Sequence, residues 1–392
     1  MELEVQQKLN LTNDPIVLTS SVQYDEITDE IAKKFDYEWG GVSTEIIELP
    51  TFPADFGIGV IVGSSGSGKS TIMRKEFGEE ERIEWDNTKS IASNFGSFEE
   101  ASNKLGAVGL NSIPTWLKPY NVLSNGEKFR ADMARRLHSN SAIDEFTSVV
   151  NREVAISCSV SIAKYIRNNG LHNIVFCSCH DDILPFLQPD WIYNTDTHTF
   201  YNGRYLRRPQ ISIDIQPCSC EAWDMFKRYH YLSGEINKAA ACYLAKINNR
   251  PIAFAAVLAL PGKGFSHAFK EHRLVVLPDY QGMGIGNRFS EAIAQGYLEK
   301  GCKYFSKTAN PRMGDHRNKS TLWRGTSHNG EARTDYLRIL KQHKNAKMSD
   351  QLIIKHADRV CYAHEYIGNG TKYPYTLYEE AADIGEQLSL FD

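Results

Sequence analysis

The sequence predicts two domains in series, a parallel α/β domain followed by an α+β domain. Its 392 residues suit two domains of the usual size. A strand runs into a G-x-x-x-x-G-K-S turn at residues 60–71, and a second strand runs into a glycine-rich turn at residues 272–286. Each turn precedes a segment with helical periodicity. We place the boundary near residue 210, which gives domains at 1–210 and 211–375 and an acidic tail at 376–392.

The first turn has the residues of a phosphate-binding P-loop. Its glycines let backbone N–H groups surround a β-phosphate, and Lys69 can reach the β- and γ-oxygens. The Ser70 hydroxyl is placed to complete the coordination of Mg²⁺. The residues predicted to hold ATP here are Gly63, Ser64, Gly66, Ser67, Gly68, Lys69, Ser70 and Thr71.

The two halves of the chain differ in their balance of basic and acidic residues. Residues 1–200 carry 17 basic and 29 acidic residues, whereas residues 201–392 carry 27 basic and 19 acidic. Residues 301–360 alone hold 13 basic and 5 acidic residues, so we expect either a surface that binds DNA or RNA or a solvated helical face. Scattered cysteines without C-x₂-C spacing, no signal-peptide pattern and short apolar runs predict a reduced cytoplasmic protein without a membrane span.

The first half begins with short elements: strands at 16–22 and 45–49 and a helix near 26–35. Tyr37 and Trp39 precede the P-loop, and either could stack on adenine or pack in a core. Further on, Leu123-Ser-Asn-Gly-Glu127 opens a helix, and such a turn is a second anion site. The last motifs of this half are Asp144-Glu145 and a strand that ends at His180. Residues 191–212 are typical of a β-hairpin with an Asn202-Gly203 turn.

This ordered set resembles the ATP-binding-cassette (ABC) ATPases over roughly residues 40–205. The resemblance implies that Asp144 holds Mg²⁺ through water, that Glu145 polarises the attacking water and that His180 contacts the γ-phosphate. It also implies that Ser124 and Gly126 close over the nucleotide of a second molecule, giving an ATP-dependent homodimer. The chain departs from the family pattern at three places. Glu127 stands where the family has glutamine, and Asn151 stands at the aspartate of the D-loop. Ser93-Asn94 replaces the glutamine of the Q-loop.

The second half predicts an antiparallel sheet and a cofactor turn. A helix-like segment at 221–231 precedes strands at 242–248 and 251–260, joined by Asn249-Arg250. The strand at 272–277 then runs into Gly282-x-Gly284-x-Gly286 and a helix at 287–300. The glycine spacing does not match the G-x-G-x-x-G of dinucleotide-binding folds. The final strand is expected at 360–367.

The stretch Val275-x-x-Pro-x-Tyr-Gln281-Gly-x-Gly-Ile-Gly286 resembles the cofactor motif of the GCN5-related N-acetyltransferases (GNAT). The resemblance implies an acyl-CoA, such as acetyl-CoA, with its pantetheine arm beside the main chain of Val275 to Leu277. Its pyrophosphate would bind backbone amides of Gln281, Gly282, Met283, Gly284, Ile285 and Gly286.

The family resemblance leaves the acid and the base open. Glu271 or His272 could serve as the base. His230-Tyr231 lies near the expected acceptor side, in an arrangement similar to GNAT-like phage DNA-modification enzymes. The family has a tyrosine that serves as the general acid, but Trp323-Arg-Gly-Thr occupies its position in this chain. Tyr304 and Tyr297 are therefore the candidates for the acid.

The chain therefore resembles fusions of an ABC-type ATPase with an acetyltransferase. The leading hypothesis is an ATP-dependent acyltransferase with a macromolecular acceptor, for which nucleic acid is a candidate. The alternative is a nucleotide-gated DNA or RNA clamp whose GNAT module does not catalyse.

Overall fold

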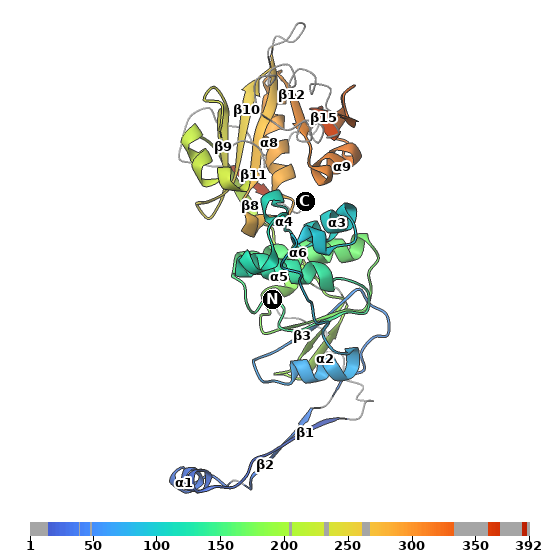
Figure 1. The fold of residues 1–392 in the computed structure, drawn as a ribbon, viewed down its shortest axis with the longest axis vertical. Coiled ribbons are helices and arrows are strands. Elements are labelled where there is room, and N and C mark those ends of the chain that lie inside the picture. Colours follow the sequence, from blue (N-terminus) through green and yellow to red (C-terminus); the bar gives the residue numbers. More distant parts are fainter. Residues whose placement is uncertain are drawn as a thin grey trace. The chain divides into compact units, whose positions relative to one another are not determined.

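The computed structural model describes residues 15–38, 40–47, 49–203, 206–230, 235–260, 267–332, 360–368 and 386–389. The chain divides into two compact units, Met1–Leu110 with Lys118–Arg208 and Asn111–Leu117 with Pro209–Asp392 (Figure 1). Both units mix helices and strands. In the part of the chain that the structure describes, no helix is long and apolar enough to cross a membrane.

The first unit is built on a sheet with the strand order β4-β5-β3-β6-β7. The strands β4, β5, β3 and β6 are parallel, and β7 pairs with β6 in the antiparallel sense. Their bounds are β3 (Ile58–Val62), β4 (Ala142–Ile143), β5 (Ile174–Ser178), β6 (Trp191–Asn194) and β7 (Thr199–Asn202). The hairpin near residue 200 turns at residues 195–198 and not at Asn202-Gly203, because β7 still pairs through Asn202.

Further helices of the first unit connect its strands. They are α2 (Lys69–Phe77), α3 (Phe98–Ala107), α5 (Asn125–Arg136), α6 (Arg152–Asn168) and α7 (Leu184–Leu187), with 3₁₀ turns at η1 (Ala92–Asn94) and η2 (Tyr120–Val122). The long helix α6 is capped by the Asn151 side chain, which accepts a hydrogen bond from the Val154 N–H at 2.8 Å.

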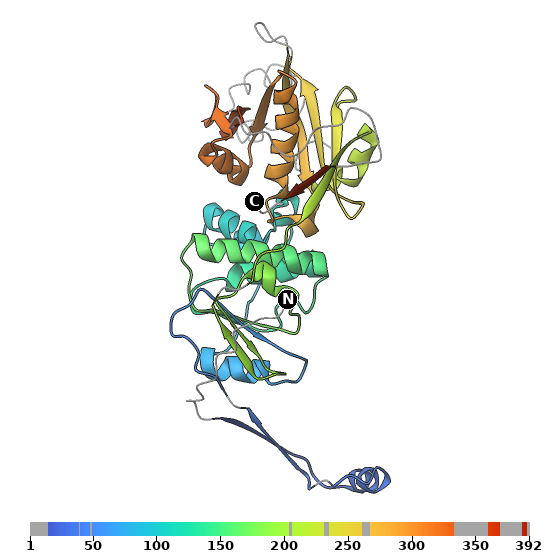
Figure 2. The same cartoon turned by 180° about the vertical axis from the view of Figure 1, so that it is seen from behind.

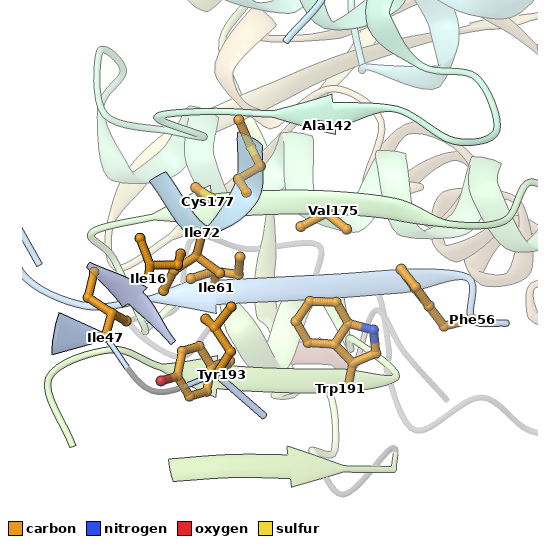
Figure 3. Close-up of a cluster of buried hydrophobic side chains, with 12 residues drawn as sticks. Ile16, Ile47, Phe56, Ile61, Ile72, Ala142, Val175, Cys177, Trp191 and Tyr193 are labelled. Carbon is orange, nitrogen blue, oxygen red and sulfur yellow. The ribbon is translucent and has the colours of Figure 1, made fainter. Parts of the chain in front are cut away.

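An aromatic and aliphatic cluster holds the P-loop strand in place (Figure 3). Ile61 of β3, Ile72 of α2 and Val175 of β5 are all fully buried in it. The ring of Trp191 stacks on Phe77, with 5.6 Å between the ring centroids. The cluster thereby fixes α2 against the sheet, and with it the loop between β3 and α2.

A two-stranded antiparallel sheet precedes this core, formed by β1 (Ile16–Ser21) and β2 (Val42–Ile47). Between the two strands lies the helix α1 (Glu26–Lys34), which begins with a capping box at Asp25. Figure 1 shows α1 at the far end of the β1–β2 pair. Ile16 and Ile47 are buried in the P-loop cluster, so the base of this sheet is anchored.

The second unit contains a sheet with the order β13-β15-β12-β11-β10-β9-β8-β16, and β14 pairs with β15 at one side. Its strands are β8 (Ser212–Cys218), β9 (Ala241–Ile247), β10 (Arg250–Ala259), β11 (Ala268–Val276), β12 (Lys303–Thr308), β13 (Trp323–Gly325), β14 (Glu331–Ala332), β15 (Val360–Tyr366) and β16 (Glu386–Ser389). Only the β11–β12 pair is parallel among the described strands of this sheet.

Helix α8 (Ile285–Glu299) lies across one face of this sheet, as Figure 2 also shows from behind. The helices α4 (Ile113–Trp116) and α9 (Pro311–Lys319) belong to the same unit. The prediction of a helix at 221–231 is wrong: residues 220–229 form two 3₁₀ turns, η3 (Cys220–Met225) and η4 (Lys227–Tyr229). Residues 386–389 of the acidic tail pair with β8.

Gly59 provides a test of the P-loop core. A Cβ at this position would lie 2.1 Å from the ring of Trp191, which is fully buried and cannot retreat. We expect Gly59→Ala to lower the free energy of unfolding by roughly 1–3 kcal/mol. Gly40→Ala is the control, since a Cβ there meets no atom within 4 Å. Urea unfolding that gives the same midpoint for both variants would contradict this packing.

Candidate functional site

The P-loop joins β3 to α2 through three glycines with positive φ. Gly63, Gly66 and Gly68 have φ values of 154°, 82° and 83°. Gly68 is the N-cap of α2, and no side chain caps the helix there, so its first N–H groups point into the loop. The Lys69 ammonium donates to the carbonyl oxygens of Gly63 at 2.9 Å and Ser64 at 2.5 Å. The Lys69 side chain therefore folds back onto carbonyl groups of its own loop.

Two side chains that the sequence motifs do not mark also contact this loop. Asp196 accepts hydrogen bonds from the Ser64 N–H at 2.8 Å and the Ser64 hydroxyl at 2.7 Å. These bonds lower the pKa of Asp196. The Thr195 hydroxyl lies 2.6 Å from the Ser67 hydroxyl. Both residues follow β6, which pairs with β3, so strand pairing alone could have indicated them.

The other predicted ATPase residues gather at the carboxyl edge of the same sheet. Asp144 and Glu145 follow β4, and His180 lies two residues beyond β5. Since β4, β5 and β3 are parallel, these residues share an edge with the P-loop. Glu145 is exposed and holds a φ of 48°, while its N–H donates to the Asp144 carboxylate at 2.9 Å.

Neighbouring side chains influence this edge. The Asp144 N–H donates to Glu80 at 3.0 Å, and burial raises the pKa of the Glu80 carboxyl. The Nδ1 atom of His180 lies 3.3 Å from the Thr147 hydroxyl. Burial, and then the charge of Arg152, lowers the pKa of His180. A neutral imidazole at this edge can donate one hydrogen bond to an anion.

Ser124 and Gly126 lie at the start of α5. Ser124 is the N-cap, and its hydroxyl and N–H both contact the Glu127 carboxylate, at 3.0 and 2.9 Å. The departure at Glu127 thus has a local role, because a glutamate at this position completes a capping box. A Cβ at Gly126 would reach Val154 at 3.7 Å, an ordinary contact distance. The Ser124 side chain is exposed at this helix end.

The second turn repeats the geometry of the first. Gly282 and Gly284 have φ values of 92° and 89°, and Gly284 is the N-cap of α8 without a side-chain cap. Gly286 lies inside α8, where a Cβ would be 3.4 Å from Val276. Met283 and Ile285 are buried, so they can offer only their backbone.

The Gln281 side chain braces the turn. Its amide donates to the Val276 carbonyl at 2.8 Å, and its oxygen accepts the Asn111 N–H at 2.9 Å. Asn111 belongs to the second unit, and its side chain also accepts a hydrogen bond from Arg312 at 3.1 Å. The sequence gives no signal for this contact, because residues 111–117 lie in the first half of the chain.

Beside this turn, β11 separates from β12. The two strands pair from Ala268 to Lys270, and β11 then continues to Val276 paired with β10 alone among the described strands. The register of the β10–β11 pair shifts at Ala256/Val257, so His272 is the extra residue of a bulge. One side of β11 therefore has no partner among the described strands, at the place where the resemblance predicts the pantetheine arm.

The main-chain N–H and carbonyl groups of Leu277 both already form hydrogen bonds. Its N–H donates to the Ile252 carbonyl at 2.8 Å, and its carbonyl accepts the Tyr280 N–H at 3.0 Å. Any contact of the arm with Leu277 would therefore use the second lone pair of that carbonyl. Pairing of the arm with Val275 and Leu277 stays a prediction.

Glu271 lies where the strands separate, and its carboxylate is surrounded by donors. It accepts hydrogen bonds from the hydroxyls of Ser290 at 2.5 Å and Ser306 at 2.9 Å. Arg317, which is 1% exposed, lies 3.3 Å away and has its guanidinium over the ring of Trp323. This network joins β11, β12, α8 and α9. It favours a structural role for Glu271, although the role of base stays a prediction.

His272 has a different environment from its neighbour. Its Nε2 is buried without a hydrogen-bond partner among the described residues, and the Arg273 guanidinium lies 3.3 Å from its Nδ1. Burial, followed by the charges of Arg273 and Lys270, lowers the pKa of His272 to about 4. His272 is therefore neutral at pH 7. His230 packs edge-on against Trp223 at 5.5 Å, and Tyr231 lies outside the described residues.

The two tyrosines considered as acids are both buried, Tyr304 on β12 and Tyr297 on α8. The Tyr304 hydroxyl is buried without a hydrogen-bond partner among the described residues, and burial raises its pKa. The Tyr297 hydroxyl lies 3.1 Å from that of Tyr243, and burial also raises its pKa. Trp323 donates to the buried Glu291 at 3.3 Å. Trp39 and residues 333–359, which hold 7 of the 13 basic residues of the 301–360 stretch, lie outside the described residues.

Residues 208–317 match the model of the acetyltransferase (GNAT) family, as the motif predicted. No curated protein matches the chain. Among solved structures, the dimeric structure of a bacterial ABC transporter cassette is 15% identical, covering 39% of this chain and 87% of that one with a TM-score of 0.31. A Bacillus subtilis acetyltransferase in complex with CoA is 12% identical, covering 40% and 97% with a TM-score of 0.29. The ribosomal-protein-S18-alanine N-acetyltransferase of Escherichia coli is 13% identical, covering 41% and 99% with a TM-score of 0.28.

The role of Glu271 can be tested by stability. Glu271→Gln would leave the Arg317 guanidinium buried without its counter-charge, and we expect the free energy of unfolding to fall by about 3–5 kcal/mol. The control is Lys270→Gln at the exposed neighbouring position, for which we expect a change within about 0.5 kcal/mol. Urea unfolding followed by tryptophan fluorescence measures both. Equal midpoints would show that the carboxylate is dispensable for the fold and would favour its role as a base.

Proposed function

We propose that the protein is an ABC-type ATPase joined to an acetyl-CoA-dependent N-acyltransferase. The observation that carries this proposal is the pair of helix starts at Gly68 and Gly284. In each, a left-handed glycine follows a strand and leaves the first N–H groups of a helix without a side-chain cap. A helix start of this kind binds phosphate. The match of residues 208–317 to the acetyltransferase family supports acetyl-CoA at the second of them.

Open space at both turns supports the fit of a phosphate group. A Cβ at Gly66 or at Gly284 would meet no protein atom within 4 Å, although both residues hold a positive φ. These two Cβ positions are therefore unfilled by the described residues. Lys69 would exchange its two carbonyl contacts for the β- and γ-oxygens of ATP. Ser70 and Asp144 would hold Mg²⁺, which neutralises phosphate charge during phosphoryl transfer.

The ATPase reaction would use the sheet edge beyond β4 and β5. Glu145 is exposed there and would orient the water that attacks the γ-phosphate, while His180 would donate a hydrogen bond to that phosphate. Ser124 and Gly126 would contact the nucleotide of a second copy, because the N-terminus of α5 is also a positive helix end. The proposed ATPase is accordingly a head-to-tail homodimer.

Acyl transfer would occur where β11 leaves β12. An acceptor amine attacks the thioester carbonyl, so that a C–N bond forms and the C–S bond breaks. The amine proton passes to the base, and a proton returns to the departing thiolate. His272 is the better candidate for the base than Glu271. Its Nε2 has no partner among the described residues, whereas both Glu271 oxygens accept hydrogen bonds.

We propose a macromolecule as the acceptor, with nucleic acid as the first candidate. The support is the excess of 13 basic over 5 acidic residues at 301–360. The second candidate function is a nucleotide-gated DNA or RNA clamp with a non-catalytic acetyltransferase module. It is favoured by the burial of Tyr304 and Tyr297, which leaves the thiolate without an evident tyrosine acid among the described residues.

The ATPase proposal predicts that Glu145→Gln traps nucleotide. Without the carboxylate, water is not activated, so the variant should retain ATP through gel filtration as a complex of two chains. Adding Ser124→Arg should release the ATP, because that residue serves the nucleotide of the other copy. Light scattering and a nucleotide assay measure both outcomes. A Glu145→Gln protein that stays monomeric and loses its ATP would contradict the proposal.

The acyltransferase proposal predicts transfer of label from acetyl-CoA. The protein is incubated with labelled acetyl-CoA, with and without ATP, together with DNA, tRNA and total protein. We expect the label in the nucleic-acid fraction, and His272→Ala should slow transfer by about 10²-fold or more. The control is Lys238→Ala, an exposed lysine of the same unit.

The pH dependence of this transfer has a defined sign. His272 must be neutral to accept a proton, so the rate should fall as the pH falls through the pKa of this side chain. That pKa of about 4 places the loss of rate near pH 4 instead of near pH 6.5.

In the labelling experiment, label in protein alone, with no salt-sensitive binding of DNA or RNA, would exclude the nucleic-acid acceptor. If none of the acceptors stimulates the release of coenzyme A, the result would favour the clamp with a non-catalytic acetyltransferase module.

A further inference from the structure

We propose that Thr147 is a positioning residue that holds the His180 imidazole with its proton on Nε2. In this form the ring donates a hydrogen bond through Nε2 and accepts one through Nδ1. The position of the proton follows from the contacts of Thr147 and His180 alone. Its effect on ATP hydrolysis rests on the proposed function.

The backbone at Thr147 has an unusual conformation. Its φ is 71°, in the left-handed region that β-branched residues rarely adopt, and Glu145 two residues earlier has a φ of 48°. Glycine or asparagine would adopt this φ with less strain. Strained residues of this kind persist only where the surrounding structure fixes them, and they concentrate at functional sites. The advantage of a threonine here therefore lies in its side chain and not in its backbone.

Phe146 fixes this segment beside β5, the strand that leads to His180. Its N–H donates to the Cys177 carbonyl at 2.7 Å, and its fully buried ring lies 4.6 Å from the ring of Phe176 between centroids. The main chain of His180 is held as well, because its N–H donates to the buried Ser178 hydroxyl at 3.0 Å. Both sides of the contact between Thr147 and His180 are thus attached to the end of β5.

The hydrogen-bonding capacity of the Thr147 hydroxyl places the ring proton. Among the described residues its partner is Nδ1 of His180 at 3.3 Å, and Thr147 is fully buried. If Nδ1 carried the proton, it would donate to the hydroxyl, whose own proton would then be buried without an acceptor. If the hydroxyl donates to Nδ1, both groups are satisfied. Burial, and then the charge of Arg152, lowers the pKa of His180, so the ring is neutral at pH 7 and its single proton lies on Nε2.

This form of the ring prepares His180 to donate to an anion. Its Nε2 has no hydrogen-bond partner in the described part of the chain, and the residue is half-buried two positions beyond β5. Ionised phosphate oxygens accept hydrogen bonds and have none to donate. The Nε2–H form therefore suits the proposed contact with the γ-phosphate, whereas the Nδ1–H form would turn a lone pair toward it.

The test is ¹⁵N NMR of the full chain, labelled at histidine and free of nucleotide, at a pH well above the ordinary pKa of histidine. We expect His180, assigned by the loss of its signals in His180→Gln, to carry its proton on Nε2. Thr147→Val keeps the shape of the side chain but removes the hydroxyl, so the two ring ¹⁵N shifts should move toward each other as the two tautomers mix. Thr147→Ser keeps the hydroxyl and should retain the wild-type shifts.

Two further variants guard this measurement. Ser159→Ala is the control, because the buried Ser159 hydroxyl donates to the Ala155 carbonyl and its loss should leave the His180 signals unchanged. Thr147→Ala takes the place of Thr147→Val if thermal melting shows that the valine variant is unfolded. A wild-type ring with its proton on Nδ1, or His180 shifts that stay unchanged without the hydroxyl, would overturn the proposal.

ATP hydrolysis separates a positioning role from a structural one. We expect Thr147→Val to lower kcat by roughly 10- to 100-fold, the range for losing the group that orients a metal-binding histidine, with KM for ATP little changed. Thr147→Ser should restore kcat, and a serine variant as slow as the valine variant would contradict the role of the hydroxyl. A wild-type protein without ATPase activity would contradict the proposed function, and the NMR signals would still decide where the ring proton lies.

Discussion

Two helices of this chain begin at a glycine in the left-handed conformation, and the proposed chemistry depends on that constraint. At Gly68 and Gly284 the values of φ are 83° and 89°, a region that an L-residue with a Cβ rarely adopts. The turn brings the strand to the start of the helix without a capping side chain. The unpaired N–H groups and the positive end of the helix dipole then face the same side. In the proposed function, the backbone of both turns would already be in the conformation that binds an anion.

The surroundings of each turn hold it in a different way. Around the P-loop, the support is apolar: a Cβ at Gly68 would lie 2.5 Å from Ile47, and Trp191 closes the core behind β3. Around the second turn, the support is polar: Gln281 spans from Val276 to Asn111, and the Glu271–Arg317 pair fixes the strands where they separate. A buried ion pair is costly unless its hydrogen bonds are complete, and here two serine hydroxyls complete them.

The sequence could predict the turns because their chemistry is local. The glycines, the strand before them and the helix after them are adjacent in the chain. The residues that it could not predict meet through the fold. Asp196 contacts Ser64 across 132 positions of sequence, and Asn111 contacts Gln281 across 170.

Two other sequence signals were open to a second interpretation. The expected helix at 221–231 failed because its apolar positions suit two 3₁₀ turns packed on the sheet equally well. The role of Glu127 as a capping partner was readable from Ser124 three residues earlier. The family pattern drew attention only to the substitution at that position.

One chain would hold two separate anion sites of the same construction. Coenzyme A itself carries an adenosine diphosphate group, so it could in principle occupy the P-loop. The direct test is calorimetric titration of acetyl-CoA into the protein already saturated with Mg·ATP. We predict binding of acetyl-CoA at a single site in each chain with unchanged affinity, and loss of that binding alone in Gly284→Glu. Competition between ATP and acetyl-CoA, or unchanged acetyl-CoA affinity in Gly284→Glu, would contradict two separate sites.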